Sequence, residues 1–98
     1  MNFLKLIRLS EVIMINPRIL NVVPLENYTV QLEYETGEFR LFNVLPYISG
    51  SWYEELRDTN YFRTVHLVSG GKGIAWGHGQ DIAPHELYDL STIEQNNR

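Results

Sequence analysis

Three side chains that could bind a metal ion or transfer a proton lie close together in the sequence: His78, Asp81 and His85. Imidazole and carboxylate groups are ligands for zinc and nickel, and they also act as acids and bases in enzymes. The spacing of these three residues matches no standard ligand motif, and they straddle an expected loop and the start of a helix. We therefore expect no metal or cofactor here, with Asp81 hydrogen-bonded to nearby backbone and both histidines exposed.

Other patterns that could support catalysis are incomplete. A hydrolase needs a nucleophile with a base, and no serine of this chain lies in a G-x-S-x-G turn. Residues 69–73 look like a phosphate-binding loop, but the Walker pattern requires a glycine where His66 stands. We predict that the protein is not an enzyme, and the alternative is an enzyme that uses His78, Asp81 and His85.

Length and composition indicate a single globular domain. Of the 98 residues, 44% are hydrophobic and 20% are charged, which is ordinary for a folded protein. Chains divide into several cores only above ~250 residues. We expect the domain to span residues 16–92, after an N-terminal extension of residues 1–15 and before a polar tail of residues 93–98.

The absence of cysteine excludes disulfide bonds, thiol catalysis and cysteine-bound zinc. No stretch approaches the ~20 apolar residues that cross a bilayer. Residues 1–15 do not read as a signal peptide, because Glu11 interrupts their apolar run and no small-residue cleavage site follows. These features favour the cytoplasm, without a membrane. The formal charge of −4, with scattered basic residues, argues against nucleic-acid binding by the chain on its own.

The first half of the chain is expected to form strands. Residues 18–23 are rich in β-branched side chains, and residues 28–34 alternate apolar and polar side chains. A two-residue loop at Thr36-Gly37 would place the second of these strands in a hairpin. That register puts Phe42 on the polar face beside Gln31, where it would be exposed or covered by a second layer.

Short helices and a second hairpin are expected in the second half. Ser51 can cap a helix over residues 52–57. Gly70-Gly71 is a strong turn signal, and a two-residue loop there would bring together Leu67 and Ile74. The last helix covers residues 84–90, begins with Pro84, and should direct Leu87 and Leu90, with Tyr88, inward.

The order of these elements predicts an α+β fold: an antiparallel sheet of two hairpins plus an N-terminal strand, with short helices on one face. No strand–helix–strand unit of crossover length repeats, which excludes a parallel sheet. Aromatic residues make up 12% of the chain, and several of them follow one another near the short helix. Since not all can be buried easily, we expect Phe42, Trp52 and Tyr53 to be candidates for contact with a partner.

Several stretches of the sequence are typical of one family. They are residues 17–24, Gly37-Glu38-Phe39-Arg40 leading to Phe42-x-Val44-x-Pro46, Leu56-Arg-Asp58 with Tyr61-Phe62, and, most specifically, Ile74-Ala-Trp76-x-x-Gly79-x-Asp81-Ile82-x-Pro84-x-x-Leu87-Tyr88. On these motifs, residues 16–90 resemble a family of small bacterial proteins catalogued as domain of unknown function 2442. The resemblance implies a compact α+β domain, and it implies no particular activity.

Standalone members of that family are often encoded beside another very small protein, an arrangement similar to toxin–antitoxin pairs. The resemblance therefore implies a small partner protein encoded nearby, for which this chain would be the antitoxin-like half. Other members are fused to a helix-turn-helix domain, so a DNA-associated regulatory subunit is an alternative. From the residues and the resemblance together, we predict a non-enzymatic protein-interaction module.

Overall fold

The structure, a computed structural model, describes residues 16–94, which form an α+β fold. Its strands form two antiparallel sheets with the orders β1-β2-β3-β7 and β4-β5-β6. The strands are β1 (Ile19–Pro24), β2 (Thr29–Tyr34), β3 (Phe39–Asn43), β4 (His66–Val68), β5 (Gly73–Ala75), β6 (Asp81–Ile82) and β7 (Thr92–Ile93). The helices are α2 (Thr59–Phe62), α3 (Pro84–Leu90) and the 3-10 turns η1 (Leu45–Tyr47) and η2 (Glu54–Arg57). The predicted fold class is confirmed, and the two hairpins belong to separate sheets.

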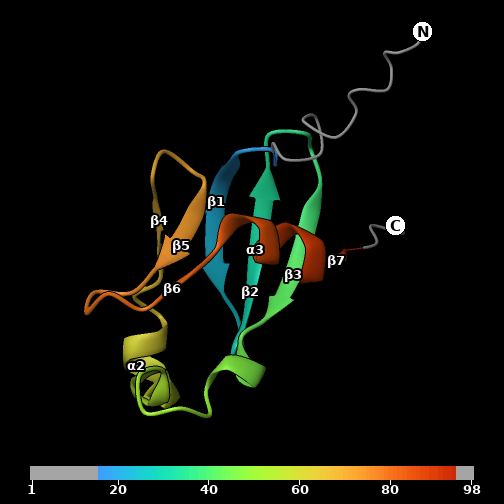
Figure 1. Ribbon diagram of the computed structural model, residues 1–98. Coiled ribbons are helices and arrows are strands. Elements are labelled where there is room, and N and C mark those ends of the chain that lie inside the picture. Colours follow the sequence, from blue (N-terminus) through green and yellow to red (C-terminus); the bar gives the residue numbers. More distant parts are fainter. Residues whose placement is uncertain (1–15, 95–98) are drawn as a thin grey trace, which may run out of the picture.

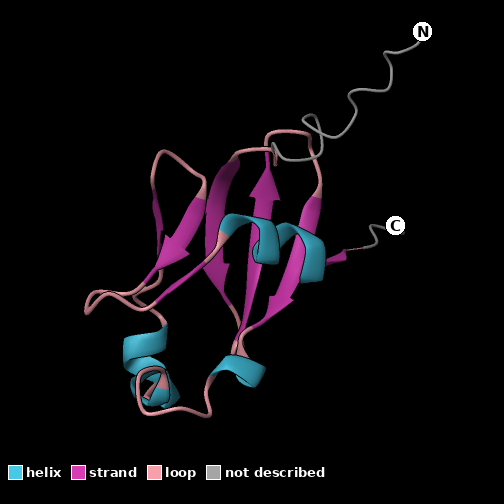
Figure 2. Ribbon diagram, in the orientation of Figure 1, coloured by secondary structure: helices cyan, strands magenta, loops and turns pink. Residues whose placement is uncertain are grey.

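The elements are arranged so that one helix covers one sheet. Figure 1 shows α3 in front of β2 and β3, with the three-stranded sheet beside β1. The short turns and α2 gather at one end of the molecule (Figure 2); we call residues 45–62 the aromatic lobe. One buried hydrophobic cluster joins the two sheets, α3 and the aromatic lobe. Its members are Ile19, Val30, Leu32, Tyr34, Phe42, Val44, Ile48, Leu56, Phe62, Val65, Ile74, Trp76, Ile82 and Leu87.

The first hairpin has a three-residue loop, so the predicted two-residue loop is wrong. The backbone N–H of Tyr34 donates to the carbonyl of Glu38 over 2.9 Å, which leaves residues 35–37 as the loop. Gly37 takes the last loop position with a φ of 97°, a conformation that glycine adopts without strain. The additional loop residue shifts the register by one, and such a shift moves each side chain of the second strand to the opposite face.

Phe42 is consequently a core residue, and its expected exposure beside Gln31 is corrected. It pairs with Val30 and is 2% exposed. Its ring centroid lies 5.7 Å from that of Tyr47, so it helps to attach the aromatic lobe to the sheet. Arg40 occupies the buried-face position opposite Leu32.

The second hairpin pairs Leu67 with Ile74, as predicted. Its loop is longer than two residues, because Val68 pairs with Gly73 and the φ angle of Ser69 is already positive. Gly71 in this loop has a φ of 93°, and its carbonyl accepts a 2.7 Å hydrogen bond from the backbone N–H of Ile19. A side chain at Gly71 would clash with the Ile19 carbonyl, so this glycine lets the second hairpin approach β1.

The last helix has the predicted bounds, Pro84–Leu90, and it buries Leu87 completely. The expectation that Leu90 points inward is wrong, since Leu90 is 63% exposed. The physical reason lies at the end of the helix, where the Arg40 guanidinium bonds the carbonyls of Tyr88 and Ser91 and occupies the space against the sheet.

The sheet continues slightly beyond the expected end of the domain at residue 92. Ile93 pairs with Arg40, and the backbone N–H of Glu94 donates to the carbonyl of Phe39 over 2.7 Å. The extension of residues 1–15 and residues 95–98 of the expected tail lie outside the described residues. Within the described part of the chain, no helix has the length and apolar character needed to span a membrane.

Candidate functional site

Trp52 is the most prominent exposed aromatic side chain of the aromatic lobe, with 53% of its surface exposed. It precedes η2, and the predicted Ser51 cap is wrong: Tyr53 is the cap residue and no side chain caps the turn. Tyr53 is half-buried, and its hydroxyl donates to the carbonyl of Asp81 over 3.0 Å. The Tyr53 ring lies 6.0 Å from that of Tyr47. Of the three predicted contact residues, Trp52 and Tyr53 therefore lie together at the surface, and Phe42 does not.

A buried glutamine, Gln80, forms a hydrogen bond with the backbone carbonyl of Trp52. Gln80 is 1% exposed, and its Nε2 donates to the Trp52 carbonyl over 3.1 Å and to Glu55 Oε1 over 3.0 Å. Its Oε1 accepts a 2.7 Å hydrogen bond from the hydroxyl of Tyr61. Because a buried amide left without partners is costly, these bonds fix the start of η2 against the 77–80 loop.

The edge of the Trp52 indole lies near Gly79. A Cβ added at Gly79 would be 3.6 Å from Cη2 and Cζ2 of the ring, which is ordinary van der Waals distance. The φ of Gly79 is 105°, which side chains rarely adopt. The benzene edge of the indole thus lies next to the 77–80 loop, while about half of the residue's surface is exposed.

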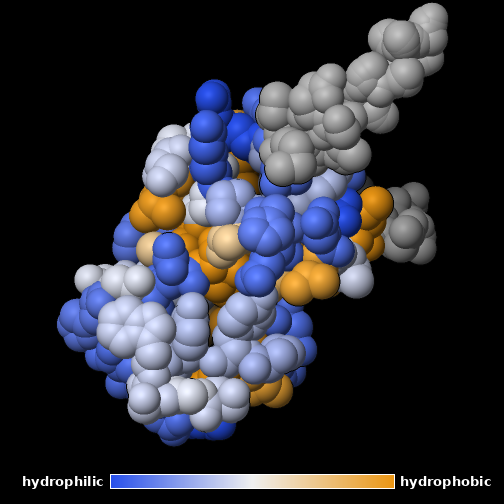
Figure 3. Space-filling model, viewed as in Figure 1, coloured by the Kyte–Doolittle hydropathy of each residue, from blue (hydrophilic) through white to orange (hydrophobic). Residues whose placement is uncertain are grey.

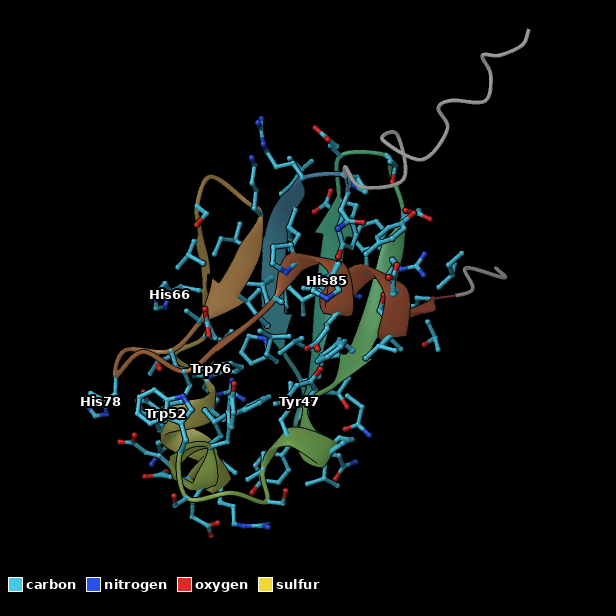
Figure 4. The ribbon with its side chains drawn as sticks, viewed as in Figure 1. Tyr47, Trp52, His66, Trp76, His78 and His85 are labelled. Carbon is cyan, nitrogen blue, oxygen red and sulfur yellow. The ribbon has the colours of Figure 1, made fainter. Side chains whose placement is uncertain are left out.

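The three residues with potential for metal chemistry do not gather. Figure 4 shows His78 on the 77–80 loop near Trp52, and His85 well away on α3. His78 is exposed, as expected; its Nδ1 lies 2.7 Å from Glu55 Oε2 and its ring stacks on Tyr61 at 5.2 Å. His85 is exposed as well. Among residues 16–94, no three His, Asp or Glu side chains are grouped so that they could hold a metal ion.

The expected backbone hydrogen bond of the Asp81 side chain is not formed within the described residues. Asp81 opens β6, opposite Ala75, and its side chain is exposed. The helix that follows has Ala83 at its cap position and receives no side-chain hydrogen bond there. Asp81 acts through its carbonyl, which accepts from Tyr53.

Comparison with known proteins places this architecture in a family. Residues 19–92 match the model of the family described as "Protein of unknown function (DUF2442)". The chain belongs to the DUF2442 family. No curated protein and no solved structure matches it. The matched segment begins with the first residue of β1 and ends within β7, so this DUF2442 domain includes both sheets and the aromatic lobe.

Sequence reasoning missed a second polar cluster of this DUF2442 domain, which we call the Arg40 cluster. The Arg40 side chain is 12% exposed, and its Nη1 lies 3.1 Å from Glu38 Oε2. Its Nε donates to Ser91 Oγ over 2.7 Å, and its guanidinium lies 4.3 Å from the centre of the Tyr88 ring. The hydroxyl of Tyr88 donates to Glu38 Oε1 over 2.9 Å. The cluster is closed on itself and joins the first hairpin to the end of α3.

Ionisation of the residues in the Arg40 cluster is shifted by burial and by these bonds. Burial alone would raise the pKa of Glu38, but hydrogen bonds from Tyr88 and Thr36, together with the charge of Arg40, lower it overall. Burial, and then the hydrogen bond to Glu38, raises the pKa of Tyr88. Burial raises the pKa of Tyr34 to about 12, and its hydroxyl has no hydrogen-bond partner among the described residues.

An open groove of about 570 Å³ lies away from both clusters, lined by Pro24, Leu25, Glu26, Asn27, Thr29, Leu41 and Arg63. None of the residues that the sequence nominated for function lines this groove. It combines two opposite charges, Glu26 and Arg63, with apolar walls, and it offers no buried polar group among its lining residues. We regard the surface around Trp52 as the candidate site.

Proposed function

We propose that this protein is a non-enzymatic, cytoplasmic interaction module that binds a small partner protein through Trp52. The observation that carries the proposal is that Trp52 combines an exposed indole with a fixed position. Half of its surface is exposed, while the edge of its ring lies near Gly79 and its backbone carbonyl is bonded by the buried Gln80.

Such a side chain is suited to contribute binding energy. Large aromatic groups bury much apolar surface for a small loss of rotamer entropy, and tryptophan is enriched among residues that dominate interface energetics. A rigid support lowers the entropic cost further, because the free protein already holds the bound conformation. Tyr53, the next residue in the chain, and Tyr47 are partly exposed aromatic side chains of the same lobe, and their two rings lie 6.0 Å apart.

The partner we propose is a small protein encoded beside this one, with this chain as the antitoxin-like half of the pair. The gene arrangement that family resemblance implies supports this choice. The alternative of a DNA-associated subunit has less support, because it needs basic side chains free to meet phosphates. Two arginines of the described residues already face carboxylates: Arg40 faces Glu38 and Arg57 faces Glu54.

The experiment is co-expression of the chain with the product of the neighbouring gene, followed by co-purification. Trp52→Ala should remove or greatly weaken the complex, since truncating a dominant interface residue costs ≥ 2 kcal/mol, roughly a thirtyfold loss of affinity. Leu20→Ala is the matched control, because Leu20 is 55% exposed and lies in β1 of the four-stranded sheet.

Both variants should melt within a few degrees of the unchanged protein, since exposed side chains contribute little to stability. If Trp52→Ala is folded and co-purifies at full strength, the proposed surface is wrong. If no small protein co-purifies with the unchanged chain, the interaction-module proposal fails as a whole.

A further inference from the structure

We infer that the part of the partner that meets Trp52 is cationic, with a lysine or arginine side chain packed against the exposed indole. This inference rests on the proposed function and adds the chemistry of the partner. It follows from the distribution of charge around the aromatic surface, which differs from that of the rest of the molecule.

The aromatic lobe and the adjoining residues 77–86 carry five carboxylates and one basic side chain, Arg57, when histidines are counted as neutral. The charge of Arg57 is already opposed within the lobe. Its Nε lies 3.2 Å from Glu54 Oε2, and its Nη2 donates to the Ile48 carbonyl over 2.9 Å. The remaining carboxylates, which have no arginine or lysine within ion-pair distance among the described residues, are Glu55, Asp58, Asp81 and Glu86.

Three of these carboxylates lie close to the aromatic side chains. Glu55 accepts from Gln80, the residue that also bonds the Trp52 carbonyl. Glu86 accepts a 2.8 Å hydrogen bond from the hydroxyl of Tyr47. The Tyr53 hydroxyl donates to the backbone carbonyl of Asp81 over 3.0 Å, so Asp81 is next to this tyrosine. Burial, and then the charges of Asp81 and Glu86, raises the pKa of the Tyr53 hydroxyl.

The same face of the molecule is apolar at its centre. Figure 3 shows hydrophobic atoms between the polar side chains over α3 and the lobe below them. A partner side chain suited to this surface has an apolar stem and a positive head, and lysine and arginine combine both. The quadrupole of a tryptophan ring attracts a cation placed over its face, and the surrounding carboxylates increase the attraction.

One further basic side chain, the exposed Arg63, directly follows the lobe, and two others lie far from it. Lys72 follows Gly71 in the turn of the second hairpin, where the Arg18 side chain lies close to Gly71. Figure 1 shows this turn and the aromatic lobe at opposite ends of the molecule. The net negative charge of the lobe and of residues 77–86 should steer a cationic partner toward this surface and an anionic one away from it.

The test measures binding of the purified neighbouring gene product to the chain at low and at high salt. Asp81→Lys reverses one charge beside the aromatic surface, at a side chain that is exposed. Asp89→Lys makes the same change at an exposed position in the last turn of α3 and serves as the matched control.

We expect Asp81→Lys to slow association and to weaken binding about tenfold or more at ~50 mM salt, and Asp89→Lys to change it about twofold or less. At ~0.5 M salt the difference should shrink, because screening shortens the reach of exposed charges. Equal effects of the two variants, or binding that salt does not weaken, would overturn the inference.

Failure of this inference can be told apart from failure of the proposed function. Loss of binding in Trp52→Ala together with full binding in Asp81→Lys means that the surface is correct and the partner is not cationic. Full binding in Trp52→Ala, in a folded variant, means that the surface itself is wrong and that the charge argument has no interface to act on.

Discussion

The Arg40 cluster and the aromatic lobe both use polar side chains to join distant parts of the chain, but they place charge and aromatic surface in opposite ways. In the Arg40 cluster the charged guanidinium is nearly buried, and it covers the ring of Tyr88. At the lobe the buried polar group is the neutral amide of Gln80 from the adjoining 77–80 loop, while charged side chains and Trp52 are exposed. The Arg40 cluster connects the first hairpin to the end of α3, whereas the lobe leaves an aromatic side chain and charged groups exposed to solvent.

The comparison shows why the exposure of Trp52 is informative. Single exposed apolar side chains are normal in proteins and need no explanation. Here, however, a buried side chain bonds the backbone carbonyl of Trp52 and is itself bonded by Tyr61, so the protein fixes the backbone at Trp52 while its indole stays exposed.

The largest expected effect comes from removing the central group of the Arg40 cluster. Arg40→Ala should destabilise the protein by about 3–5 kcal/mol, because it removes a nearly buried charge that bonds Glu38, the Ser91 hydroxyl and the carbonyls of Tyr88 and Ser91. Arg57→Ala, which breaks an exposed pair in the lobe, should cost only about 1 kcal/mol or less. Urea denaturation of both variants measures the difference, and equal losses would contradict the contrast between the two regions.

A smaller loss is expected from Gln80→Ala, which removes three buried hydrogen bonds of the lobe. The protein should lose about 1–3 kcal/mol, and Trp52 should become more mobile because its carbonyl is released. His78→Ala is the neighbouring control; His78 is exposed, and its loss should change the free energy of unfolding by less than about 1 kcal/mol. Chemical denaturation and the Trp52 indole NMR linewidth follow both effects.

Acid should reduce the contribution of the Arg40 cluster to the free energy of unfolding, and Glu38→Gln should remove this pH dependence. The folded-state pKa of Glu38 is below its unfolded value of 4.5, so its contribution is complete above that pH and is lost as pH falls through the folded pKa. Glu38→Gln should therefore be less stable than the unchanged protein by about 1 kcal/mol at pH 7, with the gap closing below pH ~4. A gap that stays constant from pH 7 to pH 3 would show that the charge of Glu38 is not involved.

The smallest effect distinguishes two tyrosines whose rings touch at 5.1 Å. Tyr88→Phe removes the hydrogen bond to Glu38 and should cost about 1 kcal/mol. Tyr34→Phe removes a buried hydroxyl that has no partner in residues 16–94, and it should be neutral or stabilising by up to about 1 kcal/mol. A loss in Tyr34→Phe comparable to that in Tyr88→Phe would reveal a partner for this hydroxyl.

The sequence predicted those elements that are determined by residues close together in the chain. Pro84 defines the start of α3, and the register of Leu67 with Ile74 follows from the alternation of side chains around the glycine turn. The register of the first hairpin was predicted wrongly because Thr36-Gly37 is compatible with loops of two and of three residues. One loop residue more or less decides which face of the sheet Phe42 occupies.

The Arg40 cluster and the hydrogen bonds of Gln80 could not be predicted from the sequence, for a different reason. Arg40 meets the Tyr88 carbonyl across 48 positions of sequence, and Gln80 meets Trp52 across 28. No periodicity or spacing marks such contacts, since they arise only when separate elements pack. Trp52 was predicted as a contact residue from the aromatic content and the clustering of aromatic residues near the short helix. The hydrogen bond from Gln80 to its carbonyl is seen only in the structure.

The claim that Trp52 is the contact with a partner can be tested without disturbing the fold. The chain has two tryptophans, so the indole N–H region of an NMR spectrum should contain two signals. Trp76 is 1% exposed and donates its Nε1–H to the Phe62 carbonyl over 2.8 Å, whereas Trp52 is 53% exposed. Trp52→Phe assigns the signals. On addition of the neighbouring gene product, the Trp52 signal should shift or broaden while that of Trp76 stays in place; saturating binding that leaves the Trp52 signal unchanged would contradict the account.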